Sequence, residues 1–195
     1  MQTLAEAVSN CTLVVGTGTL ATRKPEQRAV SLPALAPLVR QELERGGRVA
    51  VVFGPEKHGL TRDDLSTCHL LVEIPTDARQ PSMNLGQAVA VCLYELASRA
   101  VLAAGIPAYA NLPQIESKET AVPSGALDLL AGLIEQTMTA AGYSPRAMQA
   151  ANRHDLRLLL RRIRLNPADT RRILGIFRRI LWRLKREPDS GAPRN

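Results

Sequence analysis

The sequence predicts an α/β protein with a mainly parallel sheet, followed by a basic helical extension. Short apolar runs alternate with segments long enough for helices, an order typical of parallel sheets. The runs cover residues 12–15, 48–53 and 70–74. Charge is unevenly distributed, because residues 150–187 hold 12 basic and 3 acidic side chains, whereas residues 1–149 hold 12 basic and 14 acidic ones. These observations separate a nearly neutral sheet domain from a cationic C-terminal segment.

The first strand and the first helix are marked by apolar runs that end at glycine. Thr12–Val15 predicts a buried strand that ends at Gly16. Residues 20–33 show no clear period, so we expect a loop there. Leu35–Arg45 is expected to form a helix that ends at Gly46-Gly47.

The central part of the chain contains two more strands, each followed by a helix start. Arg48–Phe53 is continuously apolar after its first residue, which predicts a strand covered on both faces. Thr61–Asp64 resembles a capping box that opens a short helix. Leu70–Ile74 predicts a third strand, and a long helix is expected over residues 84–104.

Composition divides the chain into four parts. They are a sheet domain at residues 1–106, a linker at 107–123, a helical extension at 124–187 and a disordered tail at 188–195. Helices of the extension are expected to begin at Ser124, Asn152 and Asn166, the last followed by proline in the first turn. The third helix carries one apolar stripe, formed by Ile173, Ile176, Phe177, Ile180, Leu181 and Leu184.

Several classes of protein and site are excluded by what the sequence lacks. No apolar run is long enough to cross a bilayer, and the N-terminus does not resemble a signal peptide. Cys11, Cys68 and Cys92 are odd in number and widely spaced, which favours reduced thiols in the cytoplasm and argues against disulfides or zinc. We find no metal-ligand spacing, and His58 and His69 lack a matching acid or nucleophile, so we interpret them as structural or solvated.

The cationic segment suits contact with phosphate. Eleven of its twelve basic residues are arginine, whose planar guanidinium binds phosphate through two parallel hydrogen bonds. The alternatives are a solvated helix face or pairing with the acids of a partner subunit. We take RNA as the expected partner, with contacts from Arg153, Arg157, Arg161, Arg162, Arg171 and Arg172.

Two blocks in the middle of the chain each combine a strand end, a tight loop and a helix start. In the first block, Phe53–Leu60, Gly54 allows close approach of a ligand, and Glu56 is either a loop brace or a plain surface acid. In the second, Ser82 and Asn84 either cap the following helix or point into a ligand cleft. Loops that follow parallel strands meet at one edge of the sheet, where open α/β sheets bind ligands.

These blocks resemble the second and third motifs of the SpoU/TrmH family. The members of that family are SPOUT-class RNA ribose 2′-O-methyltransferases. The resemblance rests on Phe-Gly-x-Glu-x-x-Gly-Leu at 53–60, and on Ile-Pro followed by Ser-Met-Asn-Leu at 82–85. Val14–Thr17, the Thr61–Leu65 continuation and the arginine-rich extension are similar to the TrmJ branch, which methylates a cytidine or uridine ribose in the tRNA anticodon loop. The resemblance covers residues 4–104 well and residues 124–187 more loosely.

The resemblance implies a fold, a cofactor and roles for individual residues. It implies a C-terminal trefoil knot, a homodimer formed in part by the helix from Leu85, and S-adenosylmethionine as cofactor. Ser82 and Asn84 would lie at the methyl-transfer site, and Glu56 would brace the loop. The cofactor would be bound by Thr17, Gly18, Thr19, Gly54, Ile74, Ser82, Met83 and Asn84.

One departure from the family pattern affects the expected activity. The family's first motif places an Asn and an activating Arg in a unit before the Val-Val-Gly-Thr strand, but only thirteen residues precede Val14, and Arg23 is the nearest basic residue of the next loop. We therefore expect an N-terminally incomplete fold, either truncated by a misassigned start codon or degenerate, that depends on its dimer for solubility. A low activity follows, and the alternative function is that of a non-catalytic RNA-binding or dimerisation remnant.

Overall fold

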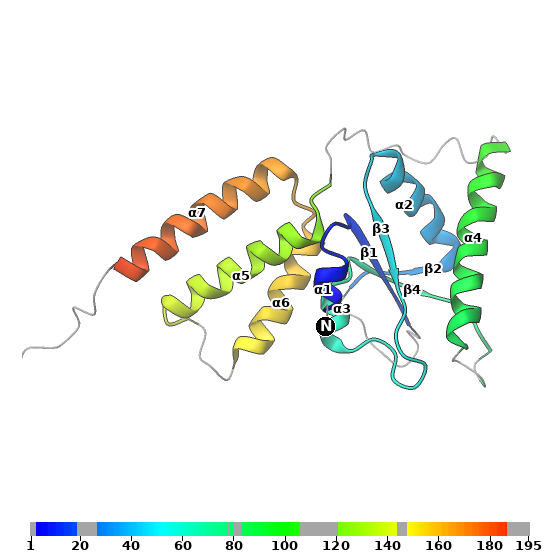
Figure 1. Cartoon of the computed structure of the whole chain (residues 1–195), viewed down its shortest axis with the longest axis horizontal. Coiled ribbons are helices and arrows are strands. Elements are labelled where there is room, and N and C mark those ends of the chain that lie inside the picture. Colours follow the sequence, from blue (N-terminus) through cyan, green and yellow to red (C-terminus); the bar gives the residue numbers. More distant parts are fainter. Residues whose placement is uncertain are drawn as a thin grey trace, which may run out of the picture.

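The computed structural model describes residues 3–18, 27–77, 79, 83–105, 121–143 and 148–186. Figure 1 shows a sheet with helices on its faces, and a separate group of three helices beside it. The strands are β1 (Leu13–Thr17), β2 (Ala29–Ser31), β3 (Val49–Val52) and β4 (Leu70–Glu73). The helices are α1 (Leu4–Ala7), α2 (Leu32–Glu44), α3 (Arg62–Ser66), α4 (Leu85–Gly105), α5 (Ser124–Ala140), α6 (Gln149–Arg162) and α7 (Pro167–Arg186).

The four strands form one parallel sheet in the order β2-β4-β1-β3. This confirms the predicted α/β class and the mainly parallel sheet. The expected loop at residues 20–33 is wrong at its C-terminal end, because Ala29–Ser31 form β2 and α2 begins at Leu32. A strand of three residues is too short to show a period, and its hydrogen bonds come from β4, about 40 residues further along the chain.

Helices cover both faces of the sheet, and side chains alternate between two apolar clusters. Leu13 and Val15 of β1 face α2 and α4, whereas Val14 faces α1 and α3. Strand β3 packs on both clusters, through Val49 on one face and Ala50 and Val52 on the other, but all four of its residues are only half-buried. Among the described residues β3 pairs with β1 alone, so it lies at the end of the sheet.

Helix α4 packs on α2 through a narrow buried face. Ala88 and Cys92 are buried, and the expected helix over 84–104 is observed as Leu85–Gly105. The opposite face carries exposed apolar side chains, with Leu93 61% and Tyr94 73% exposed. No helix in the described part of the chain is long and apolar enough to cross a membrane.

The three C-terminal helices enclose a core of their own, in which Leu130 and Leu160 are buried. The predicted start of α7 is confirmed, because the Asn166 side chain accepts a hydrogen bond from the Asp169 amide at 2.7 Å. Helix α6 begins at Gln149, three residues before the predicted Asn152. The predicted stripe on α7 is partly wrong, since Ile176 and Ile180 are exposed and Leu174 packs inward instead.

The helical extension is joined directly to the α/β part. The amides of Ser124 and Gly125 each donate a 2.8 Å hydrogen bond, to the carbonyls of Cys11 and Ser9 respectively. Helix α6 lies against α3, and Figure 1 shows the base of the three helices meeting the sheet at α1 and α3. Most of the expected linker and all of the expected tail lie outside the described residues.

Candidate functional site

The carboxyl ends of β1, β3 and β4 lie side by side, and their side chains and amides tie them together. The Thr17 hydroxyl at the end of β1 donates to the Val52 carbonyl of β3 at 3.0 Å. The Gly18 amide donates to the Val72 carbonyl of β4 at 3.2 Å. The structure therefore brings the predicted residues Thr17 and Gly18 to the edge where the Gly54 loop and Ile74 leave the sheet.

The loop after β3 is tighter than its sequence indicates. A Cβ atom at Gly54 would overlap the backbone of Gly59 and Leu60, and the Gly59 amide donates to the Pro55 carbonyl at 2.7 Å. Gly59 has φ +65°, a backbone angle that glycine adopts without strain. Glycine at position 54 is thus required by the close approach of the loop to itself, before any ligand is considered.

Glu56 and Asn84 connect the two blocks. A Glu56 carboxylate oxygen accepts a hydrogen bond from the Asn84 side-chain amide at 3.0 Å and from the Leu85 backbone amide at 2.9 Å. The Asn84 oxygen also accepts from the Gly86 amide at 2.9 Å, so Asn84 caps α4 as well. The capping alternative for Asn84 is therefore confirmed, and Asn84 also ties α4 to the Glu56 loop.

Of the remaining predicted site residues, some belong to the described part of the chain and others do not. Met83 is half-buried and immediately precedes Asn84. Ile74 is half-buried and packs on the same apolar cluster as Phe53. Thr19 and Ser82 lie outside the described residues, as does Arg23.

The edge fits the class of cofactor that the sequence predicts. Gly18 is exposed, and a Cβ there would meet no atom of the described residues within 4 Å. Phe53 and Ile74 place apolar side chains at the same edge, and the Glu56–Asn84 bond holds the two loops together. Backbone groups beside small apolar surfaces are suited to a nucleoside-containing ligand. The described residues contain no group of His, Cys, Asp or Glu able to hold a metal ion.

The six arginines proposed for RNA contact do not share one environment. Arg162, Arg171 and Arg172 are exposed, and Arg153 pairs with Glu135 at 2.8 Å. Arg161 is only 3% exposed, and its guanidinium donates to the Thr67 carbonyl, the Ser124 hydroxyl and the Asp128 carboxylate at 2.9, 3.1 and 2.9 Å. Arg157 is mostly buried and pairs with Asp63 of α3 at 3.1 Å. Arg157 and Arg161 therefore join the extension to the α/β part, and they do not belong to an exposed RNA-binding surface.

His69 is structural, as the sequence indicates, and it provides a test by pH. Its Nδ1 accepts a hydrogen bond from the Val14 amide at 3.0 Å. Burial, together with the charges of Arg161 and Arg164, lowers the pKa of His69 from 6.5 to about 3. Between these two pH values the unfolded chain binds a proton that the folded chain does not, so stability falls on acidification.

We expect the contribution of His69 to be complete above pH 6.5 and to decrease by up to ~1.4 kcal/mol per pH unit as the pH falls toward 3. Urea unfolding of the wild type and of His69→Asn, which retains an acceptor for the Val14 amide, measures this. The free energy of unfolding should decrease more steeply for the wild type than for the variant between pH 6.5 and pH 4.5. The carboxylates titrate in both proteins, so their contribution cancels in this comparison. Equal slopes would contradict the assignment.

Comparison with known proteins agrees with this geometry. Residues 1–94 match the model of the SpoU rRNA Methylase family. The tRNA (cytidine/uridine-2′-O-)-methyltransferase TrmJ of Escherichia coli (strain K12) is 32% identical over 182 residues, covering 91% of this chain and 70% of that protein, and the Shigella flexneri TrmJ gives the same values. The crystal structure of TrmJ from Z. mobilis ZM4 superposes with a TM-score of 0.75 at 25% identity, over 92% of this chain and 72% of that one. The chain therefore belongs to the SpoU/TrmH methyltransferase family, in its TrmJ-like branch.

Proposed function

We propose that this chain is an S-adenosylmethionine-dependent tRNA methyltransferase that acts on a ribose 2′-hydroxyl of cytidine or uridine in the anticodon loop. The observation that carries the proposal is the Glu56–Asn84 hydrogen bond, which joins the two family motifs at the carboxyl edge of adjacent parallel strands. The activity of the TrmJ relatives, tRNA (cytidine/uridine-2′-O-)-methylation, supports the substrate class. Cytoplasmic location is part of the same proposal.

The residues at this edge are assigned complementary roles. By the family resemblance, Thr17, Gly18 and Thr19 would line one side of the cofactor, and the backbone of Gly54 and Ile74 would line the other. Met83 would close over it, and Ser82 and Asn84 would lie nearest the reacting ribose. The cofactor supplies an electrophilic methyl carbon on a sulfonium centre when bound. The task of the chain is to hold the ribose hydroxyl in line with that carbon, because positioning removes much of the entropic barrier.

The homodimer and the trefoil knot belong to this proposal as well. The face of α4 opposite Ala88 and Cys92 carries the exposed side chains of Leu93 and Tyr94, on a helix that follows directly from the second motif. An apolar face of this kind is suited to a subunit interface. The segment from Ile74 into α4 is where the family fold would place the knot.

A methyl-transfer assay with radiolabelled S-adenosylmethionine and unmodified tRNA tests the function. We expect label in tRNA, located by nuclease digestion to a ribose in the anticodon loop. Equilibrium dialysis of the cofactor alone separates binding from transfer. Failure of the chain to bind S-adenosylmethionine at all would overturn the proposal.

A second candidate, RNA binding without catalysis, is favoured by the arginines that remain exposed. Arg162, Arg171 and Arg172 lie on the helical extension and not at the motif edge. RNA binding through them does not require an active methyl-transfer site. Salt-sensitive tRNA binding with no label transferred would support this second function.

A further inference from the structure

Helix α7 has two sides of opposite character, and only one of them is covered by the rest of the chain. Its apolar side packs on α5 and joins the core around Leu130 through Ile173, Leu174 and Phe177, and Leu181 is buried as well. The other side is cationic and exposed, and we call it the basic face. It consists of Arg171, Arg172, Arg178, Arg179, Arg183, Lys185 and Arg186.

Trp182 lies in the middle of the basic face and not on the apolar side. Successive residues of a helix are about 100° apart, which places each of the seven basic residues within about 100° of Trp182 around the axis. The indole is 42% exposed. The guanidinium carbons of Arg179 and Arg186 lie 4.7 and 4.5 Å from its ring centroid. Cation–π contacts therefore hold a large aromatic ring in place on a face of the helix that is directed away from the apolar core.

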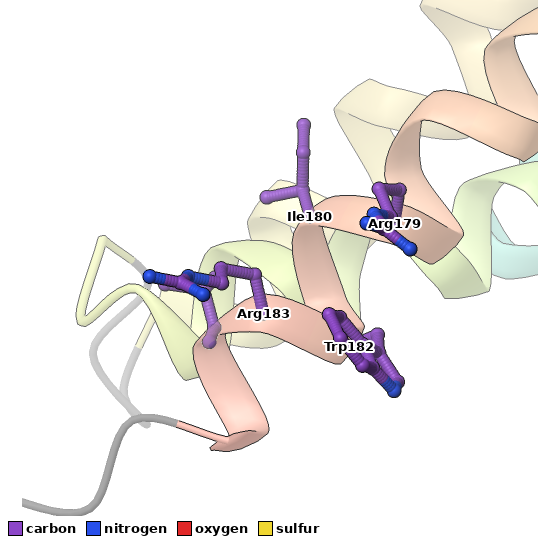
Figure 2. A pocket seen from close by; sticks show the side chains of 5 residues that line it. Arg179, Ile180, Trp182 and Arg183 are labelled. Carbon is purple, nitrogen blue, oxygen red and sulfur yellow. The ribbon is translucent and has the colours of Figure 1, made fainter.

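The surface beside Trp182 is hollowed. A shallow depression of about 300 Å³ is lined by Arg179, Ile180, Trp182, Arg183 and Leu184. Figure 2 shows Trp182 and Ile180 projecting from opposite sides of the helix, with Arg183 between them. Of the lining residues, Trp182, Arg179 and Arg183 belong to the basic face, whereas Ile180 lies on the other side of the helix.

We propose that the basic face of α7 binds an unpaired stretch of RNA, with Trp182 and its flanking arginines forming a platform on which a base stacks. This inference rests on the proposed function for its substrate class and adds a specific contact to it. Unpaired bases stack on aromatic rings and on guanidinium planes, while neighbouring arginines contact the phosphates. A paired helix offers the phosphates but no free base face.

Charge and orientation favour RNA over a lipid surface. A membrane-bound amphipathic helix buries its apolar side in the bilayer. In α7 most of that side is already covered by α5, and only Ile176 and Ile180 of its described apolar stripe are exposed, so the larger surface left for a partner is the basic face. Only Asp169 supplies a negative charge on the described part of this helix, which leaves the face complementary to a polyanion.

Trp182 is the one tryptophan of the chain, so its fluorescence reports on this site directly. We expect a short unstructured RNA oligonucleotide to quench the fluorescence at saturation and to bind more tightly than a blunt duplex of the same sequence. Trp182→Ala should weaken oligonucleotide binding about 5- to 100-fold, and Trp182→Phe should restore most of the loss. Ile176→Ala truncates an exposed apolar side chain outside the basic face of the same helix and should change the affinity by less than about twofold.

Two results would overturn the inference. One is saturable oligonucleotide binding without any change in fluorescence and with equal affinity for Trp182→Ala. The other is a fluorescence response to vesicles containing anionic lipid together with none to RNA. Circular dichroism melting of each variant verifies that α7 is intact.

The proposed function and this inference fail separately. Fluorescence quenching by RNA without methyl transfer would leave the stacking site standing and remove the enzymatic function. Methyl transfer with a KM for tRNA that Trp182→Ala does not raise would leave the enzyme standing and remove the stacking site.

Discussion

Replacing Arg161 by Met is expected to lower the free energy of unfolding by about 3–5 kcal/mol, the usual cost of removing one partner of a buried ion pair. The guanidinium of Arg161 is buried and hydrogen-bonded to α3, α5 and the Asp128 carboxylate. Without it, the partly buried Asp128 retains only the longer 3.7 Å contact with Arg157. Urea unfolding followed by circular dichroism measures the loss.

Two companion variants make this result specific. Arg162→Met removes the same charge from an exposed neighbour and should cost no more than about 0.5 kcal/mol. Arg161→Met combined with Asp128→Leu removes both charges and should recover much of the stability. The Arg161 charge also lowers the pKa of His69, so Arg161→Met should raise the pKa of that histidine. Equal losses for Arg161→Met and Arg162→Met would contradict the docking role.

Replacing Asn84 by Ala is expected to reduce methyl transfer by at least about 100-fold, a loss that positioning groups commonly cause. The variant breaks the hydrogen bond to Glu56 and removes the cap of α4. The loss of the cap costs only about 1 kcal/mol of stability, so the chain should remain folded. Turnover with radiolabelled cofactor, together with a melting curve, separates the two effects.

Asn84→Ser and Glu56→Gln serve as the matched variants. Serine retains an oxygen for the cap but is too short to reach Glu56, so stability should recover while activity stays low. Glutamine at position 56 retains an acceptor oxygen for the Asn84 and Leu85 amides, so activity should fall far less than in Glu56→Ala. Full activity of Asn84→Ala would remove this residue from the proposed site.

Local signals in the sequence predicted local structure accurately. Thr61 and Asp64 exchange the reciprocal hydrogen bonds of a capping box, and Asn166 caps α7, as their residue types indicated. Each of these features depends on groups no more than about four residues apart, so the sequence contains the whole of the signal.

Features made by distant segments were predicted poorly. β2 was missed because its hydrogen bonds come from β4. Arg161 was grouped with the exposed arginines because its neighbours in sequence are basic, whereas its partners Asp128 and Thr67 lie 33 and 94 residues away. Gly54 was assigned to ligand approach, but the backbone of Gly59 and Leu60 already requires glycine there.

The sequence by itself determined the class of fold, the helix caps at Thr61 and Asn166 and the family, because periodicity, capping and motif spacing are properties of short segments. Only the tertiary structure decided that Glu56 reaches Asn84, that Arg161 is buried at a junction and that Trp182 faces outward among arginines. The physical reason is that the burial and pairing of a polar group depend on which distant segments pack around it. That packing is set by the whole fold and not by the residues next to the group in the chain.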